Sequence, residues 1–217
     1  MKRVLLNSIL AGLAISLGGW AYLCITQKMG TNILASFVFS FGLILICNFG
    51  FNLYTGKICY LFNNAEKKFG NRLLDMGIIL LGNLIGTLIF SLLLRVLSGN
   101  NLIYETLESI TTTKLNYTWY ETIVRAFFCG ILVYTAVEGF RKIDSSIGKY
   151  IMLIMSIGIF IISGFEHSIA NMFYYFLNLN FTFNALISIL LCVIGNSIGG
   201  LFIPLIIKLI NSKIIKC

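Results

Sequence analysis

The stretch ISGFEHSIANMF, residues 162–173, places two ionisable residues inside an otherwise apolar segment. His167 is the one histidine of the chain, and Glu166 is one of its eight acidic residues. Ionisable side chains within a membrane span are costly and usually functional, whereas a lone buried histidine in a soluble domain is more often structural. The role of Glu166 and His167 therefore depends on whether this stretch lies in a membrane or in a soluble domain.

The overall composition indicates an integral membrane protein. Of 217 residues, 58% are hydrophobic and only 11% are charged, and the mean hydropathy is +0.92. So little charge cannot cover the surface of a soluble domain of this size. The net charge of +8 comes from basic residues near the ends of apolar runs, such as Lys2, Arg72 and Arg141. This pattern follows the positive-inside rule and argues against a nucleic-acid partner.

Apolar runs predict six membrane spans, each near or above the length of about 20 residues that crosses a bilayer. They are Val4–Thr26, Ile33–Phe62, Leu73–Leu97, Thr118–Phe140, Ile147–Leu177 and Phe183–Ile210. Basic residues gather before the first span, after the second, after the fourth and after the last, which predicts that both termini are cytoplasmic. The longest polar connection, about Ser98–Tyr117, is expected to be extracellular.

Two short motifs recur in the same order. GFNLYTG (50–56) and GNLIG (82–86) start 32 residues apart, and GFEHSIA (164–170) and GNSIGG (195–200) start 31 residues apart. Each half contains three spans, about 4–97 and 118–210, and an odd number of spans inverts one half relative to the other. We expect one all-α channel domain over residues 1–217, with an aquaporin-like inverted repeat. The Gly-Phe steps and the polar residues that follow them predict that spans two and five are broken near Leu53–Thr55 and Gly164–His167. Such breaks occur where backbone lines a cavity.

The breaks carry the candidate functional residues. His167 lies near the start of a second half-helix, whose free N–H groups favour an anion. Thr55 occupies the corresponding place in the first half, and its hydroxyl can donate to and accept from a histidine. A carboxylate would repel an anion, so we expect Glu166 to cap backbone or pair within the bundle. The glycines of GNLIG and GNSIGG are expected only to let helices pack closely.

The motif GFEHSIANMF resembles the hallmark of the formate/nitrite transporter family, pentameric channels for small monovalent anions and their acids. SFGLIL (40–45), NLYTG (52–56), GNLIG, TKLNYTWYE (113–121) and GNSIGG extend the resemblance from the first span to the last. It implies a homopentamer of the cytoplasmic (inner) membrane that moves anions of the formate, nitrite or hydrosulfide class together with a proton. It implies neither a cofactor nor an enzymatic activity.

The resemblance also implies roles for individual residues. His167 corresponds to the central pore histidine, Thr55 to its partner, Lys114 to a lysine of the outer vestibule, and Asn196 to a polar position of the last helix. Phe39 and Phe160 match one hydrophobic constriction, and the other is matched by Leu43, Leu53, Tyr54 and Val133.

Two departures from the family pattern affect these expectations. Gly130 stands where the fourth span of family members often carries asparagine, so one pore hydrogen bond is expected to be missing. Family members usually carry a segment before the first span that is proposed to gate the pore, and gating of that form is not expected here.

The expected mechanism follows from the energy of moving a charge through an apolar constriction. A bare anion is strongly penalised there, whereas a weak acid can take a proton and cross neutral. Lys114 would gather the anion, the phenylalanines would exclude water, and His167 would bond the substrate or exchange a proton with it.

Two alternative functions are weaker. A channel for neutral solutes would resemble aquaporins, but paired Asn-Pro-Ala motifs are missing and the sole proline is Pro204. An intramembrane enzyme could use His167 and Glu166 as acid and base, but the inverted repeat would then have no role. No metal site is expected from one histidine and six scattered cysteines, namely Cys24, Cys47, Cys59, Cys129, Cys192 and Cys217.

Overall fold

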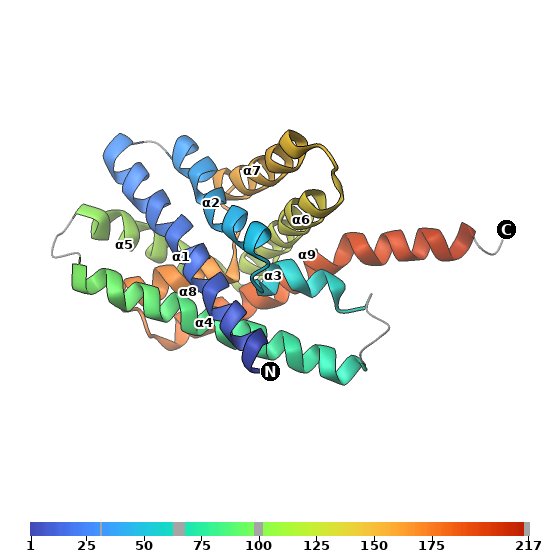
Figure 1. Ribbon diagram of the computed structural model, residues 1–217. Helices are drawn as coiled ribbons and strands as arrows, with labels where there is room; N and C mark the ends of the chain where they lie inside the picture. The colour runs from blue at the N-terminus through green and yellow to red at the C-terminus, as the bar shows by residue number, and fades with distance from the viewer. Residues whose placement is uncertain (31, 63–67, 98–101, 215–217) are drawn as a thin grey trace.

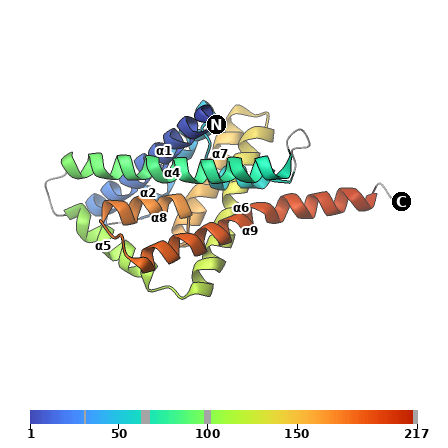
Figure 2. The same cartoon turned by 90° about the horizontal axis from the view of Figure 1, so that it is seen from below.

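The computed structural model describes residues 1–30, 32–62, 68–97 and 102–214, and every regular element in these ranges is helical (Figure 1). The elements are α1 (Lys2–Met29), α2 (Ile33–Phe49), α3 (Tyr54–Lys57), the 3-10 helix η1 (Ile58–Tyr60), α4 (Phe69–Leu97), α5 (Leu102–Leu115), α6 (Trp119–Lys142), α7 (Ser146–Ile162), α8 (Ser168–Leu177) and α9 (Phe183–Ile214). The C-terminal part of α9 projects beyond the other helices in both views (Figures 1 and 2).

Four helices of the described ranges are long and apolar enough to cross a membrane, namely α1, α4, α6 and α9. A fifth span forms if α2 is joined to α3 and η1 across their 54° bend. The predicted span Ile147–Leu177 is divided between α7 and α8, and α7 alone has 17 residues. Large apolar side chains are exposed along α4, α7 and α9, as lipid contact requires. The chain is an integral membrane protein, and its count of six spans stays a prediction.

Both predicted helix breaks are present, and a glycine begins each of them. The first lies at 50–53, just before the predicted Leu53–Thr55, because α3 already begins at Tyr54. Gly50 and Gly164 have φ angles of 68° and 65°, in the left-handed region that a residue without a side chain enters easily. The next residue then closes the helix end, because the Phe51 N–H donates to the Ile46 carbonyl at 3.1 Å and the Phe165 N–H donates to the Phe160 carbonyl at 2.9 Å. This is the bond pattern of a Schellman helix end. The Gly-Phe step of each repeat therefore encodes the break itself.

The repeated glycines bring two helix pairs into close contact. α1 packs against α4, and α6 packs against α9. A Cβ added to Gly86 would collide with the carbonyl of Ile9 on α1, and one added to Gly199 would collide with the carbonyl of Phe127 on α6. The two contacts occupy equivalent places in the two halves. The packing role predicted for these glycines accounts for them.

Gly130 belongs to the same packing of α6 against α9. A Cβ at this position would collide with the Asn196 carbonyl and lie 2.8 Å from the Gly200 nitrogen, both in the backbone of α9. On this backbone a side chain at position 130 would point into the contact with α9. That this glycine removes a pore hydrogen bond stays a prediction.

The connection before α6 contains a helix that the sequence interpretation did not predict. Residues 98–101 of the predicted polar connection lie outside the described ranges, but α5 fills Leu102–Leu115. Leu107 and Thr111 are buried one turn apart on the same face of α5. Figure 2 shows α5 beside α8, and the two helices are in contact. Lys114 lies in the last turn of α5, where the helix dipole favours a positive charge.

Candidate functional site

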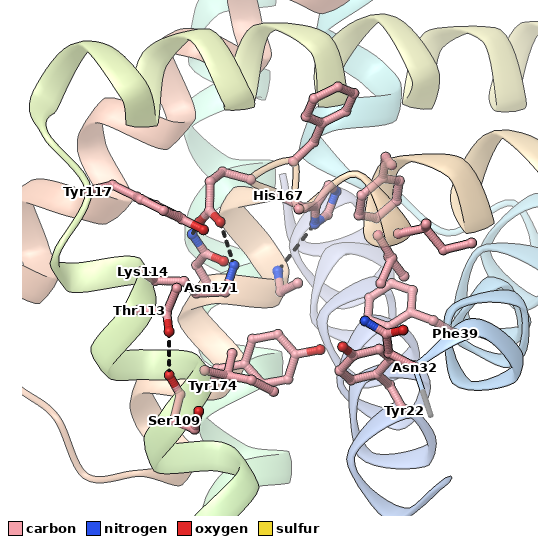
Figure 3. Close-up of a pocket in the computed structure, with 18 residues that line it drawn as sticks. Tyr22, Asn32, Phe39, Ser109, Thr113, Lys114, Tyr117, His167, Asn171 and Tyr174 are labelled. Carbon is pink, nitrogen blue, oxygen red and sulfur yellow. Dashed lines mark hydrogen bonds and ion pairs between the residues drawn. The ribbon is translucent and has the colours of Figure 1, made fainter. Parts of the chain in front are cut away.

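A cavity of about 250 Å³ lies between α5, the end of α7 and the start of α8. Four predicted site residues line it, namely Phe39, Lys114, Phe160 and His167. Figure 3 shows Lys114 and Asn171 at the left of this cavity and Phe39 at the right, with His167 between them. We call this cavity the vestibule. Among the four predicted residues, it brings together positions that are up to 128 apart in sequence (39 to 167).

His167 is fixed through both of its ring nitrogens. Its Nδ1 accepts a hydrogen bond from the Ala170 N–H at 3.2 Å, so that the imidazole caps the first turn of α8. Its Nε2 lies 2.9 Å from Oγ1 of Thr55. Because Nδ1 accepts, the ring proton of this neutral tautomer is on Nε2, which donates to the threonine. Thr55 and His167, predicted to face each other from the two breaks, do so.

Two phenylalanines of the vestibule wall pack next to His167. The Phe160 ring is stacked on the imidazole with centroids 5.8 Å apart and an interplanar angle of 24°. Phe39 meets Phe160 edge-on at 6.0 Å. Both phenylalanines are buried, at 2% and 3% exposure. They form an apolar part of the vestibule wall beside His167. Their role as a constriction stays a prediction.

Lys114 is held by Glu166 instead of standing free in the vestibule. The two charged groups are 2.7 Å apart, and their side chains are 14% and 2% exposed. Glu166 was expected to pair within the bundle, but its partner was not identified. A second donor completes the site, since Nδ2 of Asn171 donates to the other carboxylate oxygen at 2.6 Å. The vestibule therefore presents a neutralised lysine, whose attraction for an anion is balanced by the neighbouring carboxylate.

Asn171 is the functional candidate that sequence reasoning missed. It lines the vestibule one helical turn after His167, and this i, i+4 spacing was the available signal. Because a carboxylate accepts only, the amide must turn its NH₂ group toward Glu166. Its Oδ1 is buried and has no hydrogen-bond partner among the described residues. Beside the vestibule there is thus a buried acceptor that has no partner among the described residues.

Asn196 supports the second break from behind and does not line the vestibule. Its Oδ1 accepts the Ser168 N–H at 2.9 Å, and its Nδ2 donates to the carbonyls of Glu166 and Ala126, each at 2.8 Å. The amide therefore ties the unwound segment to the start of α8 and to α6. These three bonds all go to backbone atoms, so they give the amide a structural role. Contact of Asn196 with a permeating substrate stays a prediction.

Asn83 makes the same set of bonds at the first break. Its Oδ1 accepts the Tyr54 N–H at 2.8 Å, and its Nδ2 donates to the carbonyls of Asn52 and Ser8 at 2.9 and 2.7 Å. An unwound segment inside a membrane protein needs partners for its freed backbone groups. The asparagine of each Gly-Asn motif supplies them, which the packing interpretation of these motifs did not foresee.

The residues of the second predicted constriction lie in the closed core. Leu43, Leu53, Tyr54 and Val133 are all buried, and none of them lines the vestibule. Tyr54 carries the one polar group of this set, and its hydroxyl lies 2.9 Å from Oγ of Ser197 on α9. Their role as a second constriction stays a prediction.

Potential metal ligands are not clustered in the described ranges. Nowhere there do three or more histidine, cysteine or acidic side chains come together as a metal site would require. Five cysteines have free thiols, and Cys217 lies outside the described residues.

The fold and site define an integral membrane protein in which two broken helices meet behind a charged vestibule. The family model for the formate/nitrite transporter matches residues 1–210, and the chain belongs to this family. The fold agrees with two solved structures. A pentameric formate channel with formate bound superimposes with a TM-score of 0.86 at 24% identity, covering 97% of both chains. An FNT family ion channel gives 0.84 at 22% identity, covering 92% of this chain and 86% of its own.

Curated relatives match at similar identity over different lengths. The formate channel FocA of Haemophilus influenzae is 28% identical over 66% of this chain and 52% of its own length. FocA of Escherichia coli K12 is 28% identical over 76% and 62%, respectively. The formate-nitrite transporter of Plasmodium falciparum is 28% identical over 91% of this chain and 74% of its own. The chain thus spans little more than half to three fifths of the length of the FocA relatives.

Proposed function

We propose that this protein conducts small monovalent anions of weak acids, of the formate, nitrite or hydrosulfide class, across the cytoplasmic membrane together with a proton. The observation that carries this proposal is the ion-paired Lys114 in a vestibule that is also lined by His167 and two phenylalanines. The whole chain would act as one channel domain with six spans, two inverted halves, both termini in the cytoplasm and five copies in the assembly. Membership in the family and the similar fold of a pentameric formate channel support this arrangement.

The pairing of Lys114 with Glu166 suits a transient ligand. A lone buried ammonium would hold an anion tightly, whereas one that already has a carboxylate partner attracts an anion without trapping it. A protonated acid also carries an O–H donor, and Oδ1 of Asn171 is an acceptor without a partner in the described ranges. These two features fit a substrate that arrives as an anion and continues as a neutral acid.

The bonds of His167 indicate where the transported proton originates. Its Nε2 proton is engaged by Thr55, and its Nδ1 lone pair is engaged by the backbone of α8. A second proton on Nδ1 would require that the cap of α8 be broken. We therefore infer that the proton reaches the substrate from water in the vestibule, and that His167 acts as a hydrogen-bonding partner past the phenylalanines.

Neither alternative gains support from the described residues. A neutral-solute channel would not need a buried lysine–carboxylate pair in its vestibule. The imidazole is bonded at both nitrogens as a helix cap and a threonine partner, and no serine or cysteine nucleophile of the described ranges is bonded to it. We assign no enzymatic activity. The test is uptake of labelled formate by proteoliposomes under an inward proton gradient, with glycerol as the neutral comparison. Formate uptake that follows the gradient supports the proposal, and uptake of glycerol alone contradicts it.

A further inference from the structure

Thr55 lies on the short segment formed by α3 and η1 (54–60), which is too short to be a stable helix by itself. α3 has four residues and is followed by the three residues of η1. Helices of this length are not stable on their own, because few hydrogen bonds offset the ordering of the chain. The segment is also separated from α2 by the Gly50 break. The position of Thr55, and with it the bond to His167, must therefore depend on contacts made elsewhere along the segment.

Besides the bond of Thr55 to His167 and apolar packing, three hydrogen bonds that involve side chains join the segment to other helices. At its start, the Tyr54 N–H bonds Asn83 of α4, and the Tyr54 hydroxyl bonds Ser197 of α9. At its end, the Tyr60 hydroxyl donates to Oε2 of Glu138 on α6 at 2.6 Å. Only the last of these contacts involves an ionised acceptor, and charge-assisted hydrogen bonds are about twice as strong as neutral ones.

Glu138 is built into a fixed cluster. It is 8% exposed, and its other oxygen lies 3.0 Å from both the Arg141 Nη2 and the Lys142 Nζ. The Arg141 guanidinium also lies over the Tyr60 ring, 5.2 Å from its centroid. The carboxylate and the phenol ring are thus both held by the last turn of α6. None of these residues lines the vestibule, so the cluster has no part in the site described above.

We propose that Tyr60 and Glu138 are positioning residues for the Thr55–His167 hydrogen bond. The Tyr60–Glu138 contact fixes the end of the segment to α6, and the segment transmits this position to Thr55 five residues earlier. The substrate does not touch Tyr60. The transport part of this proposal rests on the proposed function, whereas the hydrogen-bond part does not.

The single histidine makes the hydrogen-bond part directly measurable. Protein labelled with ¹⁵N-histidine and purified through a tag without histidine gives one Nδ1 and one Nε2 signal. Tyr60→Phe removes the hydroxyl but keeps the ring and its contact with Arg141. We expect the Nε2 signal to move toward that of Thr55→Val, which lacks the partner hydroxyl. Tyr150→Phe is the matched control, because it removes a tyrosine hydrogen bond to Asn48 that is not on this segment. An unchanged Nε2 signal in Tyr60→Phe would overturn the proposal.

A double-mutant cycle tests the transport part. Loss of one hydrogen bond of ordinary net value predicts that Tyr60→Phe lowers formate uptake by about threefold to tenfold. In the Thr55→Val background the same substitution should have no further effect, because its target is already lost. Glu138→Gln, which keeps an acceptor for the Tyr60 hydroxyl, should cost less uptake than Glu138→Leu. Additive losses would assign the cluster a purely structural role and contradict the proposal. Absent uptake in wild type would instead contradict the proposed function, while the histidine signal still decides the hydrogen-bond part.

Discussion

Nζ of Lys114, at the end of α5, lies 2.7 Å from the Glu166 carboxylate, which immediately precedes His167 at the break between α7 and α8. This ion pair joins the vestibule wall to the segment that positions the histidine. Removing one partner would leave the other charge buried and uncompensated, which is more damaging than removing both.

Replacing Lys114 should therefore slow uptake for two reasons. Lys114→Ala removes the attraction for the anion and leaves the Glu166 carboxylate to repel it. At neutral pH we expect uptake to fall by at least about tenfold, since an unpaired buried charge costs about 2–5 kcal/mol. The defect should shrink as external pH falls, because more substrate then arrives protonated and neutral. Uptake of labelled formate as a function of external pH measures this.

The double variant Lys114→Ala/Glu166→Gln separates the two reasons. It removes both charges, so part of the lost uptake should return relative to Lys114→Ala. A double variant that is no better than the single one would show that repulsion by Glu166 contributes nothing.

Because Oδ1 of Asn171 has no partner among the described residues, we expect its removal to weaken binding of the protonated substrate in particular. Asn171→Leu removes Oδ1 and also one donor to Glu166, and we expect the apparent KM at low pH to rise by about threefold to tenfold, the value of one hydrogen bond. Asn48→Leu, at an exposed position that also carries an amide hydrogen bond, should leave the KM unchanged. A KM that rises equally in both variants would remove Asn171 from the binding site.

Because Asn83 and Asn196 make equivalent hydrogen bonds, we expect their removal to destabilise the protein equally. Each asparagine serves three backbone groups at a break, so Asn83→Ala and Asn196→Ala should each destabilise the protein by about 3 kcal/mol, given about 1 kcal/mol for each lost bond. Thermal unfolding in detergent, followed by circular dichroism, compares them. If only one of the two substitutions lowers the melting temperature, the breaks are not supported equivalently.

The sequence predicted the features that local rules determine. Gly-Phe steps encode both breaks because a left-handed glycine ends a helix, and the placing of Thr55 opposite His167 followed from the internal repeat. Contacts between side chains that are distant in sequence could not be predicted in the same way. Lys114 and Glu166 are 52 positions apart, and nothing in either neighbourhood identifies the other as its partner.

Other features were missed because one pattern permits two structures. The residues of α5 are polar enough to be taken for a loop, although Leu107 and Thr111 lie on its buried face. Gly130 was assigned to the pore by resemblance, but its missing side chain makes room for α9. Asn196 was likewise assigned to the pore by resemblance. Its hydrogen bonds to the backbone could be seen only in three dimensions.

If the permeating acid passes the Thr55–His167 pair, loss of that pair must change how uptake depends on pH. Uptake of labelled formate is compared between about pH 5 and pH 8, the range in which histidine titrates, for wild type and His167→Asn. Asparagine can still cap the first turn of α8 but is too short to keep the bond to Thr55, so the fold should persist. We expect wild-type uptake that rises as pH falls and a mutant curve of different height or shape. Curves of identical height and shape would contradict any role of His167 in permeation.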